Sequence, residues 1–343
     1  MRQSTDATAP AFVMPQPTAP SGGHAYNAAV LAAWPGAAPV PVRLPGPWPW
    51  GDRSSLALLA DALRDRPVAL VDGLVGAAHP DLLRQAASAG CRVVLLVHLP
   101  LADEGGLSEA ERVELGRREQ RSVRQAWRVV ATSLTAAAQL SRSSGRDVVA
   151  VPPGTRPAPP AQPRQPLGIV QVGSIGPRKN QLTSLQALTR CRDLHFTATL
   201  VGPVANEAYA GRVRAALGAA GATWTGALDE PALGRLLGRS ALLLHPARAE
   251  TWGMVVTEAL ARGIPAVVGA GTGAVEALRS GGGPGLPGAV VQPDDVAALA
   301  GLLRRWLEEP GLRDEWRTNA LQARPGLRRW AQCAAELAAV VQP

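Results

Sequence analysis

The chain of 343 residues is long enough for two domains of ordinary size, each with its own hydrophobic core. With 46% hydrophobic and 18% charged residues its composition is globular, which excludes a disordered protein. The formal net charge of +8 suits an anionic partner such as a nucleotide, but scattered basic residues without interleaved aromatic residues argue against nucleic acid.

The N-terminal stretch Met1–Pro20 has one early arginine and no continuous apolar core, so a secretion signal is not expected. Cys91, Cys191 and Cys333 are odd in number and far apart, which fits a reducing compartment and offers no metal-ligand spacing. No run approaches the roughly eighteen apolar residues of a membrane span. We therefore expect a cytoplasmic protein, with peripheral contact at the inner membrane face left open.

Short apolar runs alternate with helical patterns through the first half of the chain. Continuous Val and Leu runs are typical of parallel strands covered by helices on both faces, and the alternation predicts βαβ units. The predicted strands are Ala11–Met14, Val40–Leu44, Val68–Val71, Val93–Val97, Val129–Thr132 and Val148–Val151. The clearest helical patterns are Ser54–Arg64, Pro80–Ala89 and Ser108–Ala126.

Two loops of this half carry candidate ligand-binding residues. Gly22 and Gly23 open a helix after the first strand, where glycines let a ligand approach the backbone, although turns also use glycine routinely. His98 follows the strand Val93–Val97, where a cleft wall is expected, although a lone strand-end histidine is more often structural. His245 is placed similarly in the second half, and nothing else in the sequence converges on it.

A basic stripe is predicted on the helix that begins with the capping box Ser108-x-x-Glu111. Its members follow 4-3-4 spacing: Arg117, Arg121, Arg124 and Arg128. Such a stripe could contact anionic lipid or an acidic acceptor. The intervening Glu114 and Glu119 favour a solvated, ion-paired face instead.

Seven of the fifteen residues from Pro152 to Pro166 are proline, and such a stretch behaves as a semi-rigid spacer. We predict that residues 153–166 link an N-terminal Rossmann-like domain (1–152) to a C-terminal one (167–324). Ligands of doubly wound sheets bind beyond the carboxyl ends of the strands, so the two domains are expected to face each other across a cleft.

The second half repeats the strand–helix pattern. Its predicted strands are Gly168–Val172, Thr197–Val201, Ala222–Thr225, Leu242–His245, Ala266–Val268 and Ala289–Val291. Asp294 and Asp295 precede the helical pattern Val296–Leu303, so helix capping explains them without a metal. The C-terminal segment 325–343 contains the helical pattern Leu327–Val341, which is predicted to pack back on the first domain.

Lys179 is the only lysine beside 34 arginines, and it follows a strand and a glycine turn. A lysine in the first turn of a helix running to Thr189 would oppose the helix dipole, unless a ligand phosphate reconciles the two positive charges. Lys is a compact three-donor charge suited to a phosphate, and Arg178 beside it could share that contact.

The segment Glu250-Thr-Trp-Gly253-Met-Val-Val-Thr-Glu258 places two carboxylates on either side of a glycine where a helix is expected to begin. Thr251 is predicted to cap this helix, so that its first amides point outwards and bind an anion or hydroxyls. Glu250 could accept from sugar hydroxyls and Glu258 from a ribose. An isolated pair of glutamates at this spacing is usually solvated. Here a strand precedes the pair and Gly263-Ile-Pro265 follows, and this context favours ligand binding.

These segments resemble glycosyltransferase family 4, the retaining enzymes of the GT-B fold, over nearly the whole chain. The strongest section is His245-Pro-Ala-Arg-Ala-Glu250 with Glu258-Ala-Leu-Ala-Arg-Gly-Ile-Pro265. Ser21-Gly22-Gly23-His-Ala-Tyr-Asn27 and Val97-His98-Leu-Pro-Leu101 resemble the N-domain loops of an actinobacterial branch. Ser174 and Asn180 depart from the family pattern, which has Arg and Gly at these places in many members.

The resemblance implies roles for single residues. Glu250 and the amides near Gly253, Met254 and Val255 would hold the donor sugar, Glu258 the ribose and Lys179 the diphosphate. Gly23 would lie near the phosphates and His98 beside the reacting sugar.

We therefore predict a retaining transferase that moves a hexose from a nucleotide diphosphate sugar to a hydroxyl of a glycan, lipid or small-molecule acceptor. No metal or other cofactor is expected, because Lys179 and amides neutralise the phosphates. An epimerase or phosphorylase of the same fold stays open, as does a degenerate nucleotide-sugar-binding or scaffold protein, which Ser174 makes plausible. A dehydrogenase is less expected, since no Gly-x-Gly-x-x-Gly opens a helix.

Overall fold

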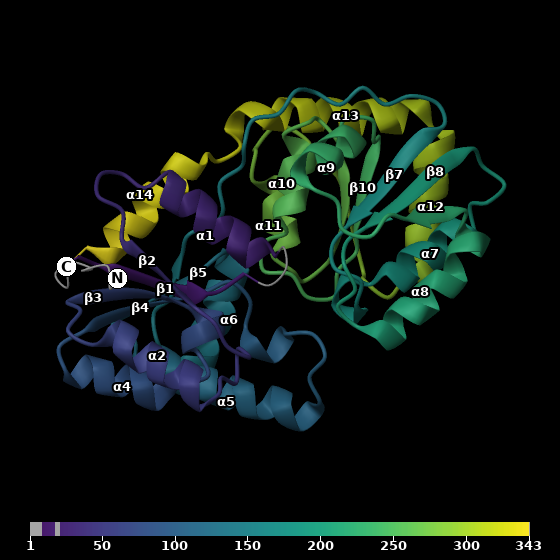
Figure 1. Cartoon of the computed structure of the whole chain (residues 1–343). Helices are drawn as coiled ribbons and strands as arrows, with labels where there is room; N and C mark the ends of the chain where they lie inside the picture. The colour runs from purple at the N-terminus through teal and green to yellow at the C-terminus, as the bar shows by residue number, and fades with distance from the viewer. Residues whose placement is uncertain (1–8, 18–20, 343) are drawn as a thin grey trace. The chain divides into compact units, whose positions relative to one another are not determined.

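The computed structural model describes residues 9–17 and 21–342 and divides the chain into two compact units (Figure 1). Met1–Gly154 and Arg329–Pro343 form the first unit, and Thr155–Arg328 forms the second. The expectation about a secretion signal falls largely on residues 1–8 and 18–20, which lie outside the described part.

The first unit is built on a parallel six-stranded sheet in the order β2-β1-β3-β4-β5-β6. Its strands are β1 (Ala11–Pro15), β2 (Val40–Leu44), β3 (Val68–Asp72), β4 (Arg92–Val97), β5 (Arg128–Ala131) and β6 (Val149–Ala150). Its helices are α1 (Gly22–Ala32), α2 (Arg53–Leu63), α3 (Gly73–Gly76), α4 (Pro80–Ser88), the 3₁₀ turn η1 (Leu101–Asp103), α5 (Glu109–Gln125), α6 (Leu134–Ser144) and α14 (Trp330–Val341).

The second unit repeats this plan with a parallel six-stranded sheet in the order β12-β11-β10-β7-β8-β9. Its strands are β7 (Leu167–Val172), β8 (Phe196–Val201), β9 (Ala222–Trp224), β10 (Leu242–His245), β11 (Ala266–Gly269) and β12 (Gly288–Val291). Its helices are η2 (Pro177–Lys179), α7 (Gln181–Thr189), α8 (Glu207–Ala220), α9 (Glu230–Leu237), α10 (Met254–Leu260), α11 (Ala274–Arg279), α12 (Val296–Glu308), α13 (Pro310–Ala323) and η3 (Arg324–Gly326).

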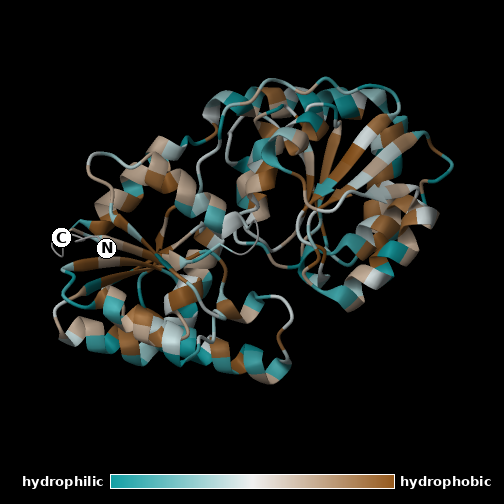
Figure 2. Cartoon of the chain, viewed as in Figure 1, coloured by the Kyte–Doolittle hydropathy of each residue, from teal (hydrophilic) through white to brown (hydrophobic). Residues whose placement is uncertain are grey.

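All twelve predicted strands are confirmed to within one residue at each end. Most could be predicted because helices cover both faces of each sheet, so that the central strands are largely apolar runs, brown in Figure 2. In β3, for example, no residue from Val68 to Val71 is more than 4% exposed. Two predicted caps are confirmed as well: Ser108 and Glu111 form a capping box on α5, and Asp295 caps α12.

Each sheet has one point where the strand order reverses, between β1 and β3 in the first unit and between β7 and β10 in the second. Connections run in opposite directions on the two sides of such a point, which leaves room for a ligand at the carboxyl ends of the strands. The loops that follow these strands are therefore where binding residues are expected.

The predicted arginine stripe on α5 is wrong in two respects. Arg128 lies in β5 and donates from Nη1 to Val340 O of α14 at 2.7 Å. Glu119 does not face solvent, because the residue is 4% exposed and its Oε1 accepts from the amide of Leu101 at 3.1 Å. Glu114 does pair with Arg117, as expected. Contact with a membrane stays a prediction.

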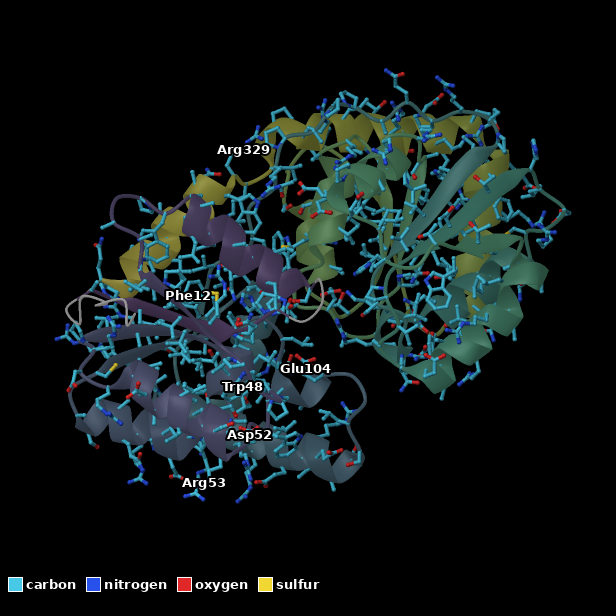
Figure 3. All side chains as sticks on the ribbon, in the orientation of Figure 1. Phe12, Trp48, Asp52, Arg53, Glu104 and Arg329 are labelled. Atoms are coloured by element: carbon cyan, nitrogen blue, oxygen red, sulfur yellow. The ribbon has the colours of Figure 1, made fainter. Side chains whose placement is uncertain are left out.

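Helix α14 packs against α1 within the first unit, and Arg329, labelled in Figure 3, marks the point where the chain enters it. The rings of Trp330 and Tyr26 meet edge to face with centroids 5.6 Å apart, and Cys333 Sγ lies 3.3 Å from the Tyr26 hydroxyl. Leu337 and Val341 are buried on the same helix. The helix therefore adds a further apolar layer to this unit.

The proline-rich segment does not form a separate spacer. Gly154 is the last residue of the first unit here, and Thr155–Pro166 belongs to the second. The amide of Ala161 donates to Arg262 O at 2.8 Å, and that of Gln162 donates to Gly238 O at 2.8 Å. These hydrogen bonds tie the segment along the surface of the second unit.

Among the described residues, no helix combines the length and the apolar character that crossing a bilayer requires.

Candidate functional site

Lys179 lies in the loop that follows β7, at the reversal point of the second sheet. It closes the 3₁₀ turn η2, whereas the sequence placed it in the first turn of the following α-helix. Its backbone oxygen accepts from Gln171 Nε2 at 2.8 Å. A Cβ on Gly173 would lie 3.3 Å from three carbons of the Lys179 stem, so this glycine lets the stem lie along the loop.

Glu250 lies in the loop that follows β10, the strand next to β7. Its backbone oxygen accepts from the amide of Gly273 at 2.8 Å. A Cβ on Gly273 would lie 1.7 Å from Thr251 O, and one on Gly269 would lie 2.2 Å from Ala247 O. Both glycines are therefore required for the loop to lie so close to β11 and α11.

The two loops bring three charged side chains together. Lys179 Nζ donates to Glu250 Oε2, and Arg178 Nη1 lies 3.8 Å from Glu250 Oε1. Their side chains are 14%, 9% and 26% exposed for Lys179, Glu250 and Arg178. Two cations against one carboxylate leave a net positive charge in a poorly solvated place, which suits a phosphate.

The pKa values of this cluster follow from burial and from its own charges. Burial raises the pKa of Glu250, but Lys179, a hydrogen bond from His245 and Arg178 outweigh it and hold that pKa well below its ordinary range. Burial lowers the pKa of Lys179, and Glu250 opposes this shift. Glu250 is therefore ionised at neutral pH and can only accept hydrogen bonds.

His245 also belongs to this site, although no role was predicted for its side chain. It ends β10 with a side chain that is 1% exposed, and its Nε2 lies 3.0 Å from Glu250 Oε2. The expectation that no other residue converges on His245 is wrong, because the loop after β10 returns Glu250 to the imidazole ring.

Helix α10 begins at Met254, and Gly253 rather than Thr251 is its N-cap residue. Gly253 has φ 83°, in the left-handed region that favours glycine. A Cβ on it would lie 3.3 Å from His245 Nε2 and 3.4 Å from Glu250 Cγ. Met254 and Val255 are partly buried in the first turn of this seven-residue helix, and their contact with a ligand stays a prediction.

Glu258 is half-buried on α10 and makes no ion pair with the Lys179 cluster. Burial raises the pKa of Glu258, and Arg262 partly opposes this shift. Arg262 Nη1 donates to the backbone oxygen of Glu258 at 3.0 Å. Its contact with a ribose stays a prediction.

The two departures from the family pattern have different consequences. The Ser174 backbone oxygen accepts from Gln181 Nε2 at 2.9 Å, and its side chain brings no positive charge to the loop. Arg178 approaches the carboxylate of Glu250 and donates to Ala249 O at 3.2 Å. The second cation of this site is therefore Arg178, next to Lys179 in the chain.

In the first unit, Gly23 of α1, which follows β1, lies against His98, which follows β4. A Cβ on Gly23 would lie 3.2 Å from His98 Cδ2, so the glycine lets α1 approach the ring. His98 Nε2 lies 2.8 Å from Asn27 Oδ1 and 3.4 Å from Asp72 Oδ2. Gly22 is the exposed first residue of α1.

Asn27 and Asp72 are part of this cluster but were not predicted as site residues. Asn27 Nδ2 donates to Asp72 Oδ2 at 2.7 Å, and both side chains are buried. Burial raises the pKa of Asp72, but His98, Asn27 and the Leu74 amide together lower it below the ordinary value. A carboxylate at the end of the apolar run Val68–Val71 was the available sequence signal.

Among the described residues, no group of three or more His, Cys, Asp and Glu side chains is arranged to hold a metal ion. Cys91, Cys191 and Cys333 are buried and form no disulfide.

Comparison with known proteins identifies the class to which this architecture belongs. Its similarity to sucrose-phosphate synthase of Thermosynechococcus elongatus has a TM-score of 0.79 at 18% identity and covers 97% of this chain and 98% of that one. HepE of Anabaena, solved in complex with UDP-glucose, gives 0.74 at 17% identity and covers 96% and 98%. The fold is GT-B, as the sequence predicted.

Residues 156–323, most of the second unit, match the family model described as glycosyl transferases group 1. A stretch of 99 residues is 35% identical to D-inositol 3-phosphate glycosyltransferase 1 of Catenulispora acidiphila. It covers 29% of this chain and 22% of that protein. The match supports the predicted actinobacterial relationship only loosely.

Proposed function

We propose that the protein is a glycosyltransferase that takes its sugar from a nucleotide diphosphate sugar. The observation that carries this proposal is the cluster of Lys179, Arg178 and Glu250 at the reversal point of the unit that matches the glycosyl transferases group 1 model. HepE, a protein of the same fold, has been solved with UDP-glucose, which supports a donor of this chemical type.

In the proposed reaction, the bond between the sugar and the diphosphate breaks and negative charge develops on the leaving phosphate. Lys179 and Arg178 stabilise that charge, because both are held by surrounding contacts and are largely removed from water. Glu250 accepts from sugar hydroxyls and so holds the sugar beside these cations.

Transfer of a hexose with retention at the anomeric carbon follows from the resemblance to family 4 and is part of the proposal. For the first unit, the resemblance supports acceptor binding, with His98 as its predicted substrate contact. The acceptor is proposed to be a glycan, lipid or small molecule with a hydroxyl.

Metal independence is also proposed, because Lys179 and Arg178 supply positive charge where other enzymes place a divalent ion. Addition of EDTA is expected to leave the initial rate of transfer unchanged. A rate that falls with EDTA and returns with Mg²⁺ contradicts this part of the proposal.

The proposal is tested with a panel of UDP-glucose, GDP-mannose and ADP-glucose, using release of the nucleoside diphosphate as the readout. We expect one donor to be selected and Lys179→Ala to lower kcat by roughly a hundredfold or more with the fold intact. Arg239→Ala is the matched control, because Arg239 is exposed and precedes the amino end of β10, whereas Lys179 follows the carboxyl end of β7.

Turnover that is equal in wild type and Lys179→Ala contradicts the phosphate role. The second candidate function is a degenerate protein that binds a nucleotide sugar without turnover. Ser174 favours this candidate because its side chain brings no positive charge to the loop. Binding of one donor by wild type without turnover on a broad acceptor panel identifies that case. Product analysis with and without an acceptor separates transfer from epimerase or phosphorylase activity.

A further inference from the structure

His245 is a fully enclosed polar group inside the candidate donor site. Its side chain is 1% exposed at the end of β10, and its Nε2 lies 3.0 Å from Oε2 of Glu250. An imidazole in this place is costly unless its polar atoms are hydrogen-bonded, so a specific contact is expected to justify it.

The position of the proton on this ring is fixed by its neighbours. Burial lowers the pKa of His245, and the charges of Lys179 and Arg178 lower it further, although Glu250 opposes them. The ring is therefore neutral at neutral pH and carries one proton. Because Glu250 is ionised and can only accept, that proton is on Nε2 and the ring donates it to Oε2.

The two carboxylate oxygens of Glu250 consequently differ in their hydrogen bonds. Oε2 receives both Lys179 Nζ and His245 Nε2, whereas Oε1 has Arg178 Nη1 at 3.8 Å. Within the described part of the chain, no hydrogen bond reaches Oε1. Two donors on one oxygen fix the plane of the carboxylate and present the other oxygen in one direction.

Packing holds the ring in this orientation. A Cβ on Gly253 would lie 3.3 Å from His245 Nε2 and 3.4 Å from Glu250 Cγ, so the left-handed glycine completes the enclosure. The backbone of Glu250 is held by Gly273.

We propose that His245 is a positioning residue for the donor site, which holds Glu250 Oε2 against Lys179 and so directs Oε1 to a hydroxyl of the donor sugar. This inference rests on the proposed function of Glu250. Lys179 keeps its phosphate contact when the ring is lost, so the effect falls on placement of the sugar rather than on binding of the nucleotide.

The expected result separates kcat from KM. His245→Leu keeps the site filled but removes the donor, and is expected to lower kcat by roughly ten- to a hundredfold with KM changed by less than about threefold. His245→Gln places an amide donor near the position of Nε2 and is expected to restore most of kcat. Buried His79, whose Nε2 lies 3.0 Å from Pro49 O in the other unit, provides the matched control pair His79→Leu and His79→Gln.

The experiment measures kcat and KM of these variants with UDP-glucose, or with the member of the donor panel that wild type uses. A second measurement compares urea unfolding of His245→Leu, Glu250→Gln and the double variant. Because the two side chains share one hydrogen bond, their effects on stability are expected to be non-additive.

A loss of kcat in His245→Leu that His245→Gln restores, together with non-additive stability, supports the proposal. If stability falls but kcat of the folded Leu variant equals that of wild type, His245 is only structural and the inference is overturned while the proposed function stands. Additive stability effects also overturn it. Failure of wild type to bind or turn over any member of the panel removes the proposed function itself, and this inference with it.

Discussion

Asn180 shows how a residue other than glycine can follow Lys179. Its backbone, at φ 59° and ψ 38°, is left-handed, a region that Asn tolerates better than most residues. Its Nδ2 donates to Pro246 O at 3.1 Å and to Pro293 O at 2.5 Å. The side chain thereby links the Lys179 turn to the loops after β10 and β12.

Replacement of Asn180 tests this link. Asn180→Ala is expected to lower the free energy of unfolding by about 2–4 kcal/mol, since it strains the left-handed backbone and leaves buried carbonyls without their donor. Asn180→Gly adopts the left-handed backbone without strain but loses the same hydrogen bonds. It is therefore expected to lower the free energy of unfolding less than Asn180→Ala does. Urea unfolding measures both variants.

Asp65 is the matched control, because it has φ 57° and is exposed. Asp65→Ala is expected to cost only the backbone term, about 1–2 kcal/mol. Equal losses for Asn180→Ala and Asp65→Ala contradict the role of the Asn180 side chain.

For single residues, the sequence predicted which charged side chains belong to the site but not which of them contact one another. Lys179, Glu250 and Arg178 stood out by residue type and motif, and the structure brings them together. His245, Asn27 and Asp72 are different, because their partners are reached only through the folded loops at the sheet edges. A polar residue that follows an apolar run indicates the carboxyl end of a strand. It does not indicate which other side chain that residue will contact.

Among the helices, α5 has a buried face that includes the carboxyl group of Glu119. Glu119 accepts from the Leu101 amide in η1, and Arg112 Nη1 donates to Ala102 O. Burial raises the pKa of Glu119 to about 8, and the charges of Asp103 and Glu104 add to this shift. Helix α5 therefore holds the loop that follows His98, and one of its contacts depends on pH.

Stability is expected to fall as pH rises from about 4.5 to 8, because the native state then binds a proton at Glu119 that the unfolded chain has released. Glu119→Gln removes this dependence while keeping an oxygen that can accept from Leu101. Relative to wild type, the variant should gain on the order of a few kcal/mol in unfolding free energy between pH 5 and pH 9. Urea unfolding at the two pH values measures this difference.

Glu114→Gln is the control on the same helix, since the hydrogen bonds from Arg118 and Arg117 lower the pKa of Glu114. Both pH values lie above its ordinary pKa of 4.5, so its difference from wild type should be constant. A constant difference for Glu119→Gln as well contradicts the buried, protonated carboxyl.

Elements were predicted well where burial produces continuous apolar runs, and poorly where polar residues are buried. The central strands have that signal, as β3 and β10 illustrate, whereas the edge strand β2 is only partly buried. The surface assigned to α5 was wrong at Glu119, because a charged residue at helical spacing looks the same in sequence whether it faces solvent or a neighbouring loop.

Across the whole molecule, the first unit is completed by the end of the chain. Gly154, the last residue of its first segment, passes directly over the start of α14. A Cβ there would lie 2.3 Å from the Trp330 amide nitrogen and 2.4 Å from its Cα. Only glycine allows these two backbone segments, far apart in sequence, to cross so closely.

Gly154→Ala is accordingly expected to lower the free energy of unfolding by about 2 kcal/mol or more, because backbone cannot yield to a new methyl group as a side chain can. Gly211→Ala, within α8 and with open space around it, is the control and should be neutral or stabilising by about 1 kcal/mol. A Gly154→Ala protein as stable as wild type contradicts this crossing.

The division of the chain into two sheet-based units was predicted from the sequence. The packing of the proline-rich segment on the second unit was not. Its composition indicates that it cannot be a helix or a central strand, but not whether it packs. Its amides at Ala161 and Gln162 bond to the second unit, a fact that depends on the fold of residues far along the chain.

Lys179 is proposed to bind the diphosphate of a nucleotide sugar while Glu250 holds the sugar. A crystal structure of the protein with the donor selected from the panel tests it most directly. We expect a phosphate oxygen within hydrogen-bond distance of Lys179 Nζ and a sugar hydroxyl that donates to Glu250 Oε1. A donor bound elsewhere, with Lys179 and Glu250 paired as in the free protein and contacting no part of it, contradicts the account.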